Sequence, residues 1–362
     1  MCELNYDNLL NLSPYSISQK EKEELLTINL NNLTVHHQQN CIAYQNILNA
    51  LYGTNKSDYQ LSEIPYLPVR LFKQYELKSV PQEELFKTMT SSGTTGQQVS
   101  RIYLDRETST RQSKVLAKIT SDFIGKNRLP MIILDTSAIV KNREMFSARG
   151  AGIMGFSIFA RDKMYALNEN MELQIEEIQN FLKKHEGSPV FLFGFTFMIW
   201  QHVISEMKKK NFHPDFSNAI LIHGGGWKKL ADQKITNSDF KQALLDTCSL
   251  TKVHDYYGMV EQTGTIYMEC EHGRLHSPVW ADIIIRSTKD FSVLPVGEKG
   301  LIQVLSILPT SYPGHSLLTE DEGIITGIDD CPCGRKGKTI SICGRIARAE
   351  LRGCSDTYEP TK

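Results

Sequence analysis

Residues 90–96 read Thr-Ser-Ser-Gly-Thr-Thr-Gly, and they are the most informative stretch of the chain. Hydroxyl-bearing residues stand on both sides of Gly93, so backbone N–H and side-chain O–H groups would face one small volume. Glycines let a backbone approach an anion closely and adopt turn conformations closed to other residues. The segment therefore predicts a phosphate-binding loop, although an ordinary polar surface loop is the alternative. It is not a Walker loop, because G-x-x-x-x-G-K-[ST] is absent.

Outward from this loop, short apolar runs alternate with longer amphipathic ones. The runs MIILD (131–135), VFLFGF (190–195) and AILIHGG (219–225) predict buried strands. Residues 172–184 and 239–247 predict helices between them. Strands that alternate with helices indicate an α/β fold with a largely parallel central sheet. Ligands of such sheets bind at loops beyond the carboxyl ends of the strands.

The N-terminal region, residues 1–60, is predicted to be helical. Ser18 and Glu21 have the spacing of a capping box, and a mixed polar and apolar pattern follows them. His36 and His37 lie within this region, and we expect both to face solvent.

The composition of the chain excludes some classes of partner. The chain has 362 residues, of which 41% are hydrophobic, and this is enough to bury a sizeable core. Its 40 Lys and Arg residues nearly balance its 41 Asp and Glu residues, so the formal net charge is -1. A protein that binds a polyanion usually carries an excess of positive charge or a cluster of basic residues. We therefore expect no nucleic-acid partner.

Targeting and membrane segments are not expected either. The first residues, MCELNYDNLL, lack the cationic and apolar regions of a secretory signal. The longest apolar stretch, residues 190–200, is much shorter than a membrane-spanning helix of about 20 residues. We expect no membrane span and a cytoplasmic location. In that reducing compartment the eight cysteines would bind metal or react rather than form disulfides. The sequence does not indicate an oligomeric state.

The string SSGTTG (91–96) resembles the phosphate loop of the adenylate-forming superfamily, which includes acyl-CoA synthetases, luciferases and peptide-synthetase adenylation domains. Further superfamily elements follow in the expected order, namely HGGGW (223–227), YYGMVE (256–261), TED (319–321) and GR (344–345). The resemblance implies the α/β fold of an adenylate-forming N-terminal domain, with mixed and parallel sheets, and a truncated C-terminal domain. The implied parts are a helical region packed on the main domain, the adenylating domain, and a hinge with a short tail (1–60, 61–343 and 344–362).

The resemblance also implies a role for each matching residue. Phosphate contacts are implied for the loop residues Ser91, Ser92, Gly93, Thr94, Thr95 and Gly96, with Thr95 also catalytic. Adenine contacts are implied for Gly224, Gly225, Gly226, Tyr257 and Gly258. Glu261 would hold Mg²⁺, a hard cation that prefers oxygen ligands. Asp321 would accept hydrogen bonds from the ribose of ATP. Arg345, at the hinge, is expected to contact the nucleotide and to be catalytic.

The chain departs from the superfamily pattern at three positions. Val260 stands where Thr is usual, Glu320 replaces a glycine, and Ala347 replaces the usual hinge Asp or Lys. Most members also carry a small domain after the hinge that delivers a catalytic Lys, and this sequence does not continue into one. Three alternatives stay open: a nearby cation replaces its charge, with Lys336, Lys338 and Lys362 as candidates; another protein supplies it; or adenylation is slow.

A closer resemblance covers nearly the whole chain from about residue 60. The segments TSSGTTGQ, SARGAGIMGF (147–156), HGGGWKK (223–229) and residues 344–357 are similar to the LuxE-like acyl-protein synthetases of bacterial luminescence operons. In that family a cysteine near the C-terminus takes the acyl group from the adenylate, and Cys354 matches it. The family passes the acyl group to a partner reductase, so a comparable reductase or an acyl carrier is implied here. The implied substrate is a carboxylic acid, with fatty acids as the family's class.

Nucleophilic chemistry at Cys354 is reasonable without the resemblance. An acyl-phosphate anhydride is a strong electrophile, and nearby cations raise the thiolate fraction of a cysteine. Arg345, Arg348 and Arg352 precede Cys354 closely in the sequence, whereas Asp356 acts in the opposite direction. The alternative is an incidental reduced cysteine.

Four further residues predict a structural zinc site. Cys270, His276, Cys331 and Cys333 could close a tetrahedral Cys₃His site, with His272 as the competing imidazole. A similar arrangement occurs in the related phenylacetate–CoA ligases. Free cysteines in a loop are the alternative.

Two rival functions remain open. The first is a CoA ligase of the phenylacetate type, in which coenzyme A is the acceptor thiol. The second is a nucleotide-binding scaffold that has lost catalysis, which Ala347 and the lack of a lysine-bearing domain suggest. A hydrolase and a dinucleotide-binding enzyme are not indicated, because the chain has neither a G-x-S-x-G elbow nor a GxGxxG fingerprint.

Overall fold

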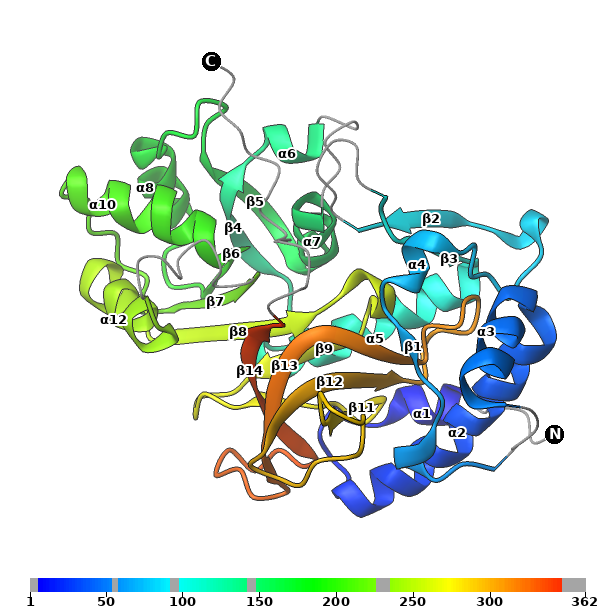
Figure 1. Cartoon of the computed structure of the whole chain (residues 1–362). Helices are drawn as coiled ribbons and strands as arrows, with labels where there is room; N and C mark the ends of the chain where they lie inside the picture. Colours follow the sequence, from blue (N-terminus) through cyan, green and yellow to red (C-terminus); the bar gives the residue numbers. More distant parts are fainter. Residues whose placement is uncertain (1–5, 54–57, 92–97, 142–147, 226–234, 347–362) are drawn as a thin grey trace. The chain divides into compact units, whose positions relative to one another are not determined.

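The computed structural model describes residues 6–53, 58–91, 98–141, 148–225 and 235–346. The chain forms two compact units, each with its own core. Unit 1 comprises residues 1–91, 96–120 and 258–350, and unit 2 comprises residues 92–95, 121–257 and 351–362. Figure 1 shows the elements of both units. Within the part of the chain that the structure describes, no helix combines the length and apolarity needed to cross a bilayer.

Unit 2 is built on a parallel sheet. Its strands lie in the order β5-β4-β6-β7-β8, and each neighbouring pair is parallel. The bounds are β4 (Leu129–Thr136), β5 (Ala160–Leu167), β6 (Val190–Phe195), β7 (Ala219–Gly224) and β8 (Lys252–Gly258). The helices of unit 2 are α6 (Ala138–Lys141), α7 (Ala148–Phe156), α8 (Ile175–Lys184), α9 (Thr196–Met198), α10 (Ser205–Lys209) and α12 (Asn237–Cys248). Short η4 (Ser157–Phe159) and η5 (Ile199–Ile204) also lie among the described residues of this unit.

The predicted strands and helices of unit 2 are confirmed. Strands β4 and β6 contain the first two predicted apolar runs, β7 covers all but the last residue of the third, and every residue of each strand is buried. The predicted helices correspond to α8 and α12, with ends that differ by at most three residues. Burial on both faces explains why these strands read as continuous apolar runs, as parallel strands between helices do.

Unit 1 contains an antiparallel sheet, so the expectation of a largely parallel sheet holds for unit 2 alone. Its strands lie in the order β11-β12-β13-β14-β10-β9, and β1 pairs in parallel with β13. The bounds are β1 (Leu67–Pro68), β9 (Ile266–Glu269), β10 (Leu275–His276), β11 (Ala281–Arg286), β12 (Lys299–Ser306), β13 (Ser316–Ile328) and β14 (Lys338–Arg345). A separate hairpin joins β2 (Lys87–Thr90) to β3 (Arg101–Leu104), and α5 (Arg106–Ile124) follows it.

Helices form the N-terminal region of unit 1, as predicted. They are α1 (Tyr6–Asn11), α2 (Gln19–Asn40), α3 (Ile42–Tyr52) and α4 (Leu71–Gln74), with short η1 (Leu61–Glu63) and η2 (Gln82–Glu84). Ser18 caps α2, and both hydrogen bonds of the capping box with Glu21 are present. In Figure 1, α2 and α3 lie beside each other near the antiparallel strands.

The expectation that His36 and His37 face solvent is wrong. His37 is fully buried, and its ring stacks on that of His315 at 4.9 Å. Its Nδ1 lies 2.7 Å from the Ser79 hydroxyl, and its Nε2 donates to the Pro309 carbonyl. His36 is half-buried. These partners come from segments remote in the sequence, so the local pattern of α2 could not reveal them.

Candidate active site

Ser91, at the start of the predicted phosphate loop, pairs with Ser100, which lies four residues beyond the end of that loop, in unit 1. Ser91 follows β2, and Ser100 precedes β3. The backbone N–H of Ser91 donates to the Ser100 carbonyl at 3.1 Å, and that of Ser100 donates to the Ser91 hydroxyl at 2.9 Å. This pairing continues the β2–β3 hairpin by one step. Ser91 and Ser100 are therefore held to each other where the described part of the hairpin ends.

Glu261 lies in the short turn η6 (Val260–Gln262), between β8 and β9. Its side chain is buried and hydrogen-bonds with Ser100, at the foot of the predicted phosphate loop. Its backbone carbonyl accepts a hydrogen bond from the Tyr312 hydroxyl at 2.9 Å, and Gln112 of α5 donates to the same hydroxyl. Tyr312, in the loop before β13, thus holds the backbone of Glu261, and Gln112 of α5 holds the Tyr312 hydroxyl in turn.

Asp321 and Arg345 face each other across an antiparallel pair. They are register partners in β13 and β14, and the Nε of Arg345 donates to Asp321 Oδ1 at 2.9 Å. Thr319 supports Asp321, because its hydroxyl accepts from the Asp321 backbone N–H. Glu320 replaces the usual glycine and forms an ion pair with Arg70 at 2.6 Å. No sequence pattern indicated this pair, whose members stand 250 positions apart.

These groups influence one another electrostatically. Burial raises the pKa of the Glu261 carboxyl, whereas the hydrogen bond with Ser100 and the positive charge of Arg345 act to lower it. The negative charge of Asp321 acts to raise it further. One cluster of interacting polar groups within unit 1 is therefore formed by Ser91, Ser100, Glu261, Asp321 and Arg345. This cluster is called the unit 1 cluster below.

A second predicted segment lies at the carboxyl edge of the unit 2 sheet. Gly224 ends β7, and a Cβ there would lie 2.4 Å from the Tyr256 ring, so only glycine fits against this tyrosine. Gly225 has φ +91°, a conformation that favours glycine, and it packs on Phe195. Tyr257 is the penultimate residue of β8, and the chain enters unit 1 at Gly258, the last residue of that strand.

His223 supports the same glycine segment. Its Nδ1 lies 2.9 Å from the Thr196 hydroxyl, which also contacts the carbonyls of Gly224 and Gly225. Burial lowers the pKa of His223 to about 3, so the ring is neutral at pH 7. A buried neutral imidazole that holds a hydroxyl is a structural feature. We assign it no acid–base role.

Several predicted site residues lie outside the described part of the chain. They are Ser92, Gly93, Thr94, Thr95 and Gly96 of the loop, Gly226, and Cys354. Their roles stay predictions.

The four predicted zinc ligands converge in unit 1. The ligand atoms of Cys270, His276, Cys331 and Cys333 all lie within 4.8 Å of one another. Cys270 follows β9 and His276 ends β10, while the two other cysteines lie in the turn before β14. The competing His272 is exposed, and it contacts the cluster only through its backbone N–H, which donates to the Cys270 sulfur.

The spacing of these atoms fits zinc. The sulfurs of Cys270 and Cys331 are 3.7 Å apart, and the Cys333 sulfur lies 3.3 Å from His276 Nε2. Zn–S bonds of about 2.3 Å at tetrahedral angles place two sulfurs about 3.8 Å apart, and a sulfur and an imidazole nitrogen about 3.5 Å apart. The donor set is therefore compatible with a closed Cys₃His site.

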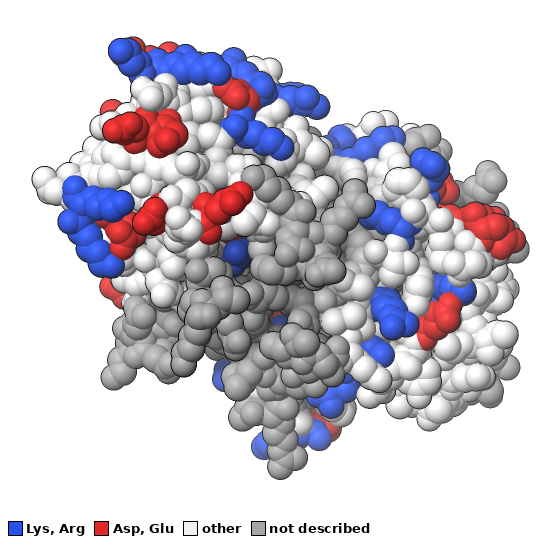
Figure 2. Space-filling view, turned by 90° about the horizontal axis from the view of Figure 1, so that it is seen from above, with Lys and Arg blue, Asp and Glu red and all other residues white. Residues whose placement is uncertain are grey.

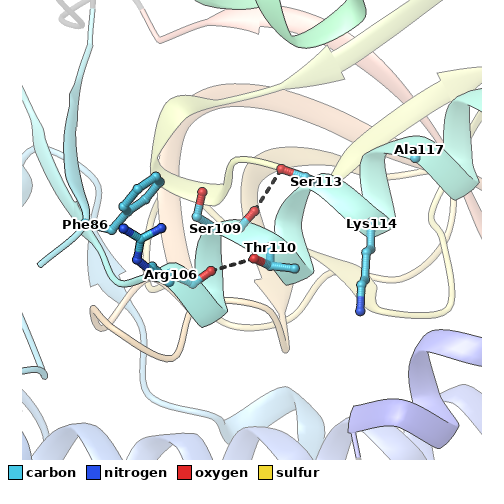
Figure 3. A pocket seen from close by; sticks show the side chains of 7 residues that line it. All are labelled: Phe86, Arg106, Ser109, Thr110, Ser113, Lys114 and Ala117. Atoms are coloured by element: carbon cyan, nitrogen blue, oxygen red, sulfur yellow. Dashed lines mark hydrogen bonds between the residues drawn. The ribbon is translucent and has the colours of Figure 1, made fainter. Parts of the chain in front are cut away.

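A hollow of about 420 Å³ lies elsewhere on unit 1, along α5. Figure 3 shows its lining, with the Arg106 guanidinium over the Phe86 ring. The hydroxyls of Thr110 and Ser113 donate to backbone carbonyls of their own helix. None of the predicted site residues lines this hollow. On the face of the molecule that Figure 2 shows, acidic and basic side chains lie near one another.

Comparison with solved structures defines the class of fold. A 2-hydroxyisobutyryl-CoA ligase, solved in an open conformation with its acyl-adenylate and CoA, matches with a TM-score of 0.69. The match covers 92% of this chain and 77% of that chain, at 14% sequence identity. The fold is that of the adenylate-forming ligases, as the sequence predicted.

The chain itself belongs to the LuxE family of acyl-protein synthetases, whose family model matches residues 2–361. Two relatives are long-chain-fatty-acid–luciferin-component ligases. That of Aliivibrio fischeri is 26% identical over 82% of this chain and 78% of its own length. That of Vibrio harveyi is 23% identical over 95% of this chain and 89% of its own length. The predicted family is confirmed, and the protein is an enzyme of the ligase class.

Proposed function

We propose that the enzyme activates a fatty acid with ATP and then transfers the acyl group to its own Cys354. The observation that carries this proposal is the unit 1 cluster. It brings Ser91, the first residue of the phosphate loop, and Ser100 next to a buried carboxylate, Glu261, and an aspartate–arginine pair. ATP activation needs groups of these kinds for phosphates, a cation and a ribose. The names of the two bacterial relatives support a long-chain fatty acid as the substrate.

In the first step, a carboxylate oxygen of the acid attacks the α-phosphorus of ATP. The bond to the β-phosphate breaks, so acyl-AMP forms and pyrophosphate leaves. The loop from Ser91 to Gly96 would donate hydrogen bonds to the phosphates, and such donors stabilise charge that grows as pyrophosphate departs. Asp321 would accept hydrogen bonds from the ribose hydroxyls, and Arg345 would orient Asp321 and contact the nucleotide.

Glu261 would hold Mg²⁺ in this step. A buried carboxylate is a hard oxygen ligand, and Mg²⁺ in such sites usually shares its coordination with substrate phosphates. When bound, the cation supplies positive charge that offsets the negative charge of the phosphates. Glu261 is buried, and this shields a cation bound to it from water.

In the second step, the Cys354 thiolate attacks the acyl carbon. The bond between that carbon and the AMP oxygen breaks, so a thioester forms and AMP leaves. A thiolate is a strong nucleophile, and covalent capture splits one difficult transfer into two easier ones. The thioester would then be delivered to a partner, an acyl reductase or an acyl carrier.

The Cys354→Ser variant tests the acceptor. We expect acid-dependent ATP–pyrophosphate exchange to remain, while the mass increase of the intact protein by one acyl group is lost. The control is Cys343→Ser, because Cys343 is the exposed thiol of β14. This variant should still gain the acyl group. Retained acylation of Cys354→Ser would refute transfer to Cys354, and release of acyl-CoA when coenzyme A is added would favour the CoA ligase.

The Cys₃His cluster is proposed to hold a structural Zn²⁺. Four protein ligands leave no open position for a substrate or a water, so the metal would not take part in catalysis. It would tie the turn before β14 to the β9–β10 hairpin, and β14 carries Arg345. Metal analysis of protein purified without chelator should give about one zinc per chain if the four donors are filled.

A further inference from the structure

Unit 2 contains a buried ion pair that the proposed reaction does not use. Asp135 stands near the end of β4, and Arg149 lies in the first turn of α7. The Arg149 Nε is 3.0 Å from Asp135 Oδ2, and the two side chains are 3% and 0% exposed. Arginine and aspartate are rarely buried to this degree. The pair therefore needs a physical reason.

The hydrogen bonds of this pair are incomplete. Asp135 Oδ1 accepts from the Thr136 backbone N–H at 2.7 Å. The Arg149 Nε and Asp135 Oδ2, although close, are not aligned for a hydrogen bond with each other or with another residue that the structure describes. Arg149 Nη1 points at the sulfur of Met198, which is a weak acceptor. A buried pair left in this state is a poor source of stability.

The pair lies at the edge of the sheet where ligands bind. Strand register sets Ile133 opposite Phe193, so Asp135 lies level with Phe195 two residues further on. Phe195 in turn pairs with Gly224 of the glycine segment. Ligands of parallel sheets bind beyond the carboxyl ends of the strands. Asp135 therefore lies level with the proposed adenine segment, at the carboxyl end of the parallel strands.

An aromatic layer adjoins the guanidinium. Arg149, Gly152 and Phe156 are spaced three and four residues apart, so they share one face of α7. A Cβ on Gly152 would lie 3.0 Å from the Phe195 ring, and Phe156 stacks on Phe193 at 4.3 Å. This face of α7 therefore turns toward β6. At one end of this face lie the buried N–H groups of Arg149, and along the rest lie the aromatic rings of Phe156, Phe193 and Phe195.

We propose that Arg149 binds an oxygen of the carboxylic acid substrate, and that Asp135 is the positioning residue that orients its guanidinium. The apolar part of the acid then lies along the aromatic face. This inference rests on the proposed function, and it assigns Arg149 as a residue that recognises the acid substrate. The oxygen acceptor is either the carboxylate or a hydroxyl or carbonyl oxygen on the chain. Because Asp135 already balances the charge of Arg149, a neutral oxygen adds no buried charge.

The test measures ATP–pyrophosphate exchange as a function of acid and of ATP. Arg149→Lys keeps the positive charge but loses the planar fork of donors. One lost hydrogen bond to a charged group corresponds to a rise of about 10- to 100-fold in the KM for the acid. The KM for ATP should stay the same. The matched control is Arg161→Lys, an exposed arginine of β5, which should leave both constants unchanged.

A second variant separates binding from folding. Asp135→Asn combined with Arg149→Met removes both charges and keeps similar volumes, so no unpaired charge stays buried. We expect it to unfold near the wild-type temperature and still to show the raised KM for the acid. Decanoate and 3-hydroxydecanoate distinguish the two oxygens. A wild-type preference for the hydroxy acid that Arg149→Lys abolishes assigns the chain oxygen, whereas equal losses with both acids assign the carboxylate.

Unchanged acid KM in both folded variants would overturn the inference while leaving the proposed function intact. If the wild-type enzyme shows no acid-dependent exchange at all, the proposed function fails, and the inference fails with it.

Discussion

The Glu261 carboxyl has a raised pKa because it is buried. Its ordinary value is 4.5, so a proton competes for this group at a higher pH than it would in an exposed glutamate. Protonation removes the negative charge that would hold Mg²⁺. The proton and the metal therefore compete for one carboxylate.

We predict that activity falls as the pH is lowered, with a midpoint above 4.5. A higher Mg²⁺ concentration should move this midpoint to lower pH, because the metal displaces the proton. Exchange rates measured across pH at two Mg²⁺ concentrations check this. Glu261→Gln should lose the Mg²⁺-dependent rate. A midpoint that does not move with Mg²⁺ would argue against Glu261 as its ligand.

Gly264 fixes the turn that follows Glu261. It has φ +87°, and a Cβ there would lie 2.6 Å from the backbone of Gln112 in α5. Gly297 has nearly the same conformation, φ +90°, but nothing lies within 4 Å of its Cβ position. The two glycines thus differ in packing and not in backbone conformation.

We predict that Gly264→Ala destabilises unit 1 more than Gly297→Ala does. Both substitutions place a side chain at positive φ, at a cost of about 1 kcal/mol. Gly264→Ala adds overpacking against a backbone, which costs a further 1–3 kcal/mol, roughly. Denaturant unfolding of the two variants measures the difference. Equal losses would mean that α5 moves away at little cost.

Residue identity predicted some site positions and missed others. The Ser91–Gly96 loop and Glu261 were predicted from short motifs, and the structure brings the described parts of those motifs together. Arg70 had no such signal, because its role depends on a Glu320 that is distant in sequence. Arg149 lay within a family-like string, but its pairing with Asp135 follows only from the packing of α7 on the sheet.

At the scale of elements, the Cys₃His cluster joins the β9–β10 hairpin to the turn before β14. We predict that Cys333→Ser lowers the zinc content and the free energy of unfolding together, because binding energy at a structural zinc is folding energy. Zinc analysis and thermal unfolding check this. Cys343→Ser is the control, since Cys343 lies on β14 outside the cluster and should change neither quantity. Full stability of a metal-free protein would contradict the zinc proposal.

The α2 helix is joined to the β12–β13 connection by stacked histidines. Burial lowers the pKa of His315 to about 3 and also lowers that of His37. A base with a lowered pKa in the folded state binds a proton more readily when unfolded. Stability from these neutral rings is therefore complete above pH 6.5 and is lost as the pH falls below it.

We predict a falling free energy of unfolding below pH 6.5, and a shallower fall in His37→Gln. One fewer proton taken up on unfolding reduces the slope by up to about 1.4 kcal/mol per pH unit. Urea unfolding at several pH values measures both slopes. Equal slopes in the two proteins would show that His37 does not contribute.

Helices and strands could be predicted where the pattern of apolar and capping residues lies within one short segment of the sequence. The buried parallel strands are continuous apolar runs, and α2 begins at a capping box, so both were predicted. The antiparallel strands of unit 1 carry polar residues that serve tertiary roles, such as Asp321 in β13 and Gln303 in β12. Those positions break the hydrophobic pattern, so the residue pattern did not predict these antiparallel strands, although the family resemblance implied mixed sheets.

At the scale of the whole molecule, unit 1 is assembled from three separate stretches of the chain. The unit 1 cluster takes Ser91 and Ser100 from the earlier stretches and Glu261, Asp321 and Arg345 from the last. Family resemblance predicted the class of fold, because motifs keep their order along the chain. The division into units was not visible in the order of motifs, since it depends on which strands pair.

The account's central claim is that the enzyme makes an acyl-adenylate from a carboxylic acid and ATP. Acid-dependent exchange of labelled pyrophosphate into ATP measures this step alone, before any thiol takes part. We predict exchange with a fatty acid in wild type and in Cys354→Ser, and its loss in Glu261→Gln and Asp321→Ala. ATP binding without exchange for any acid, or equal exchange in Glu261→Gln, would contradict the claim.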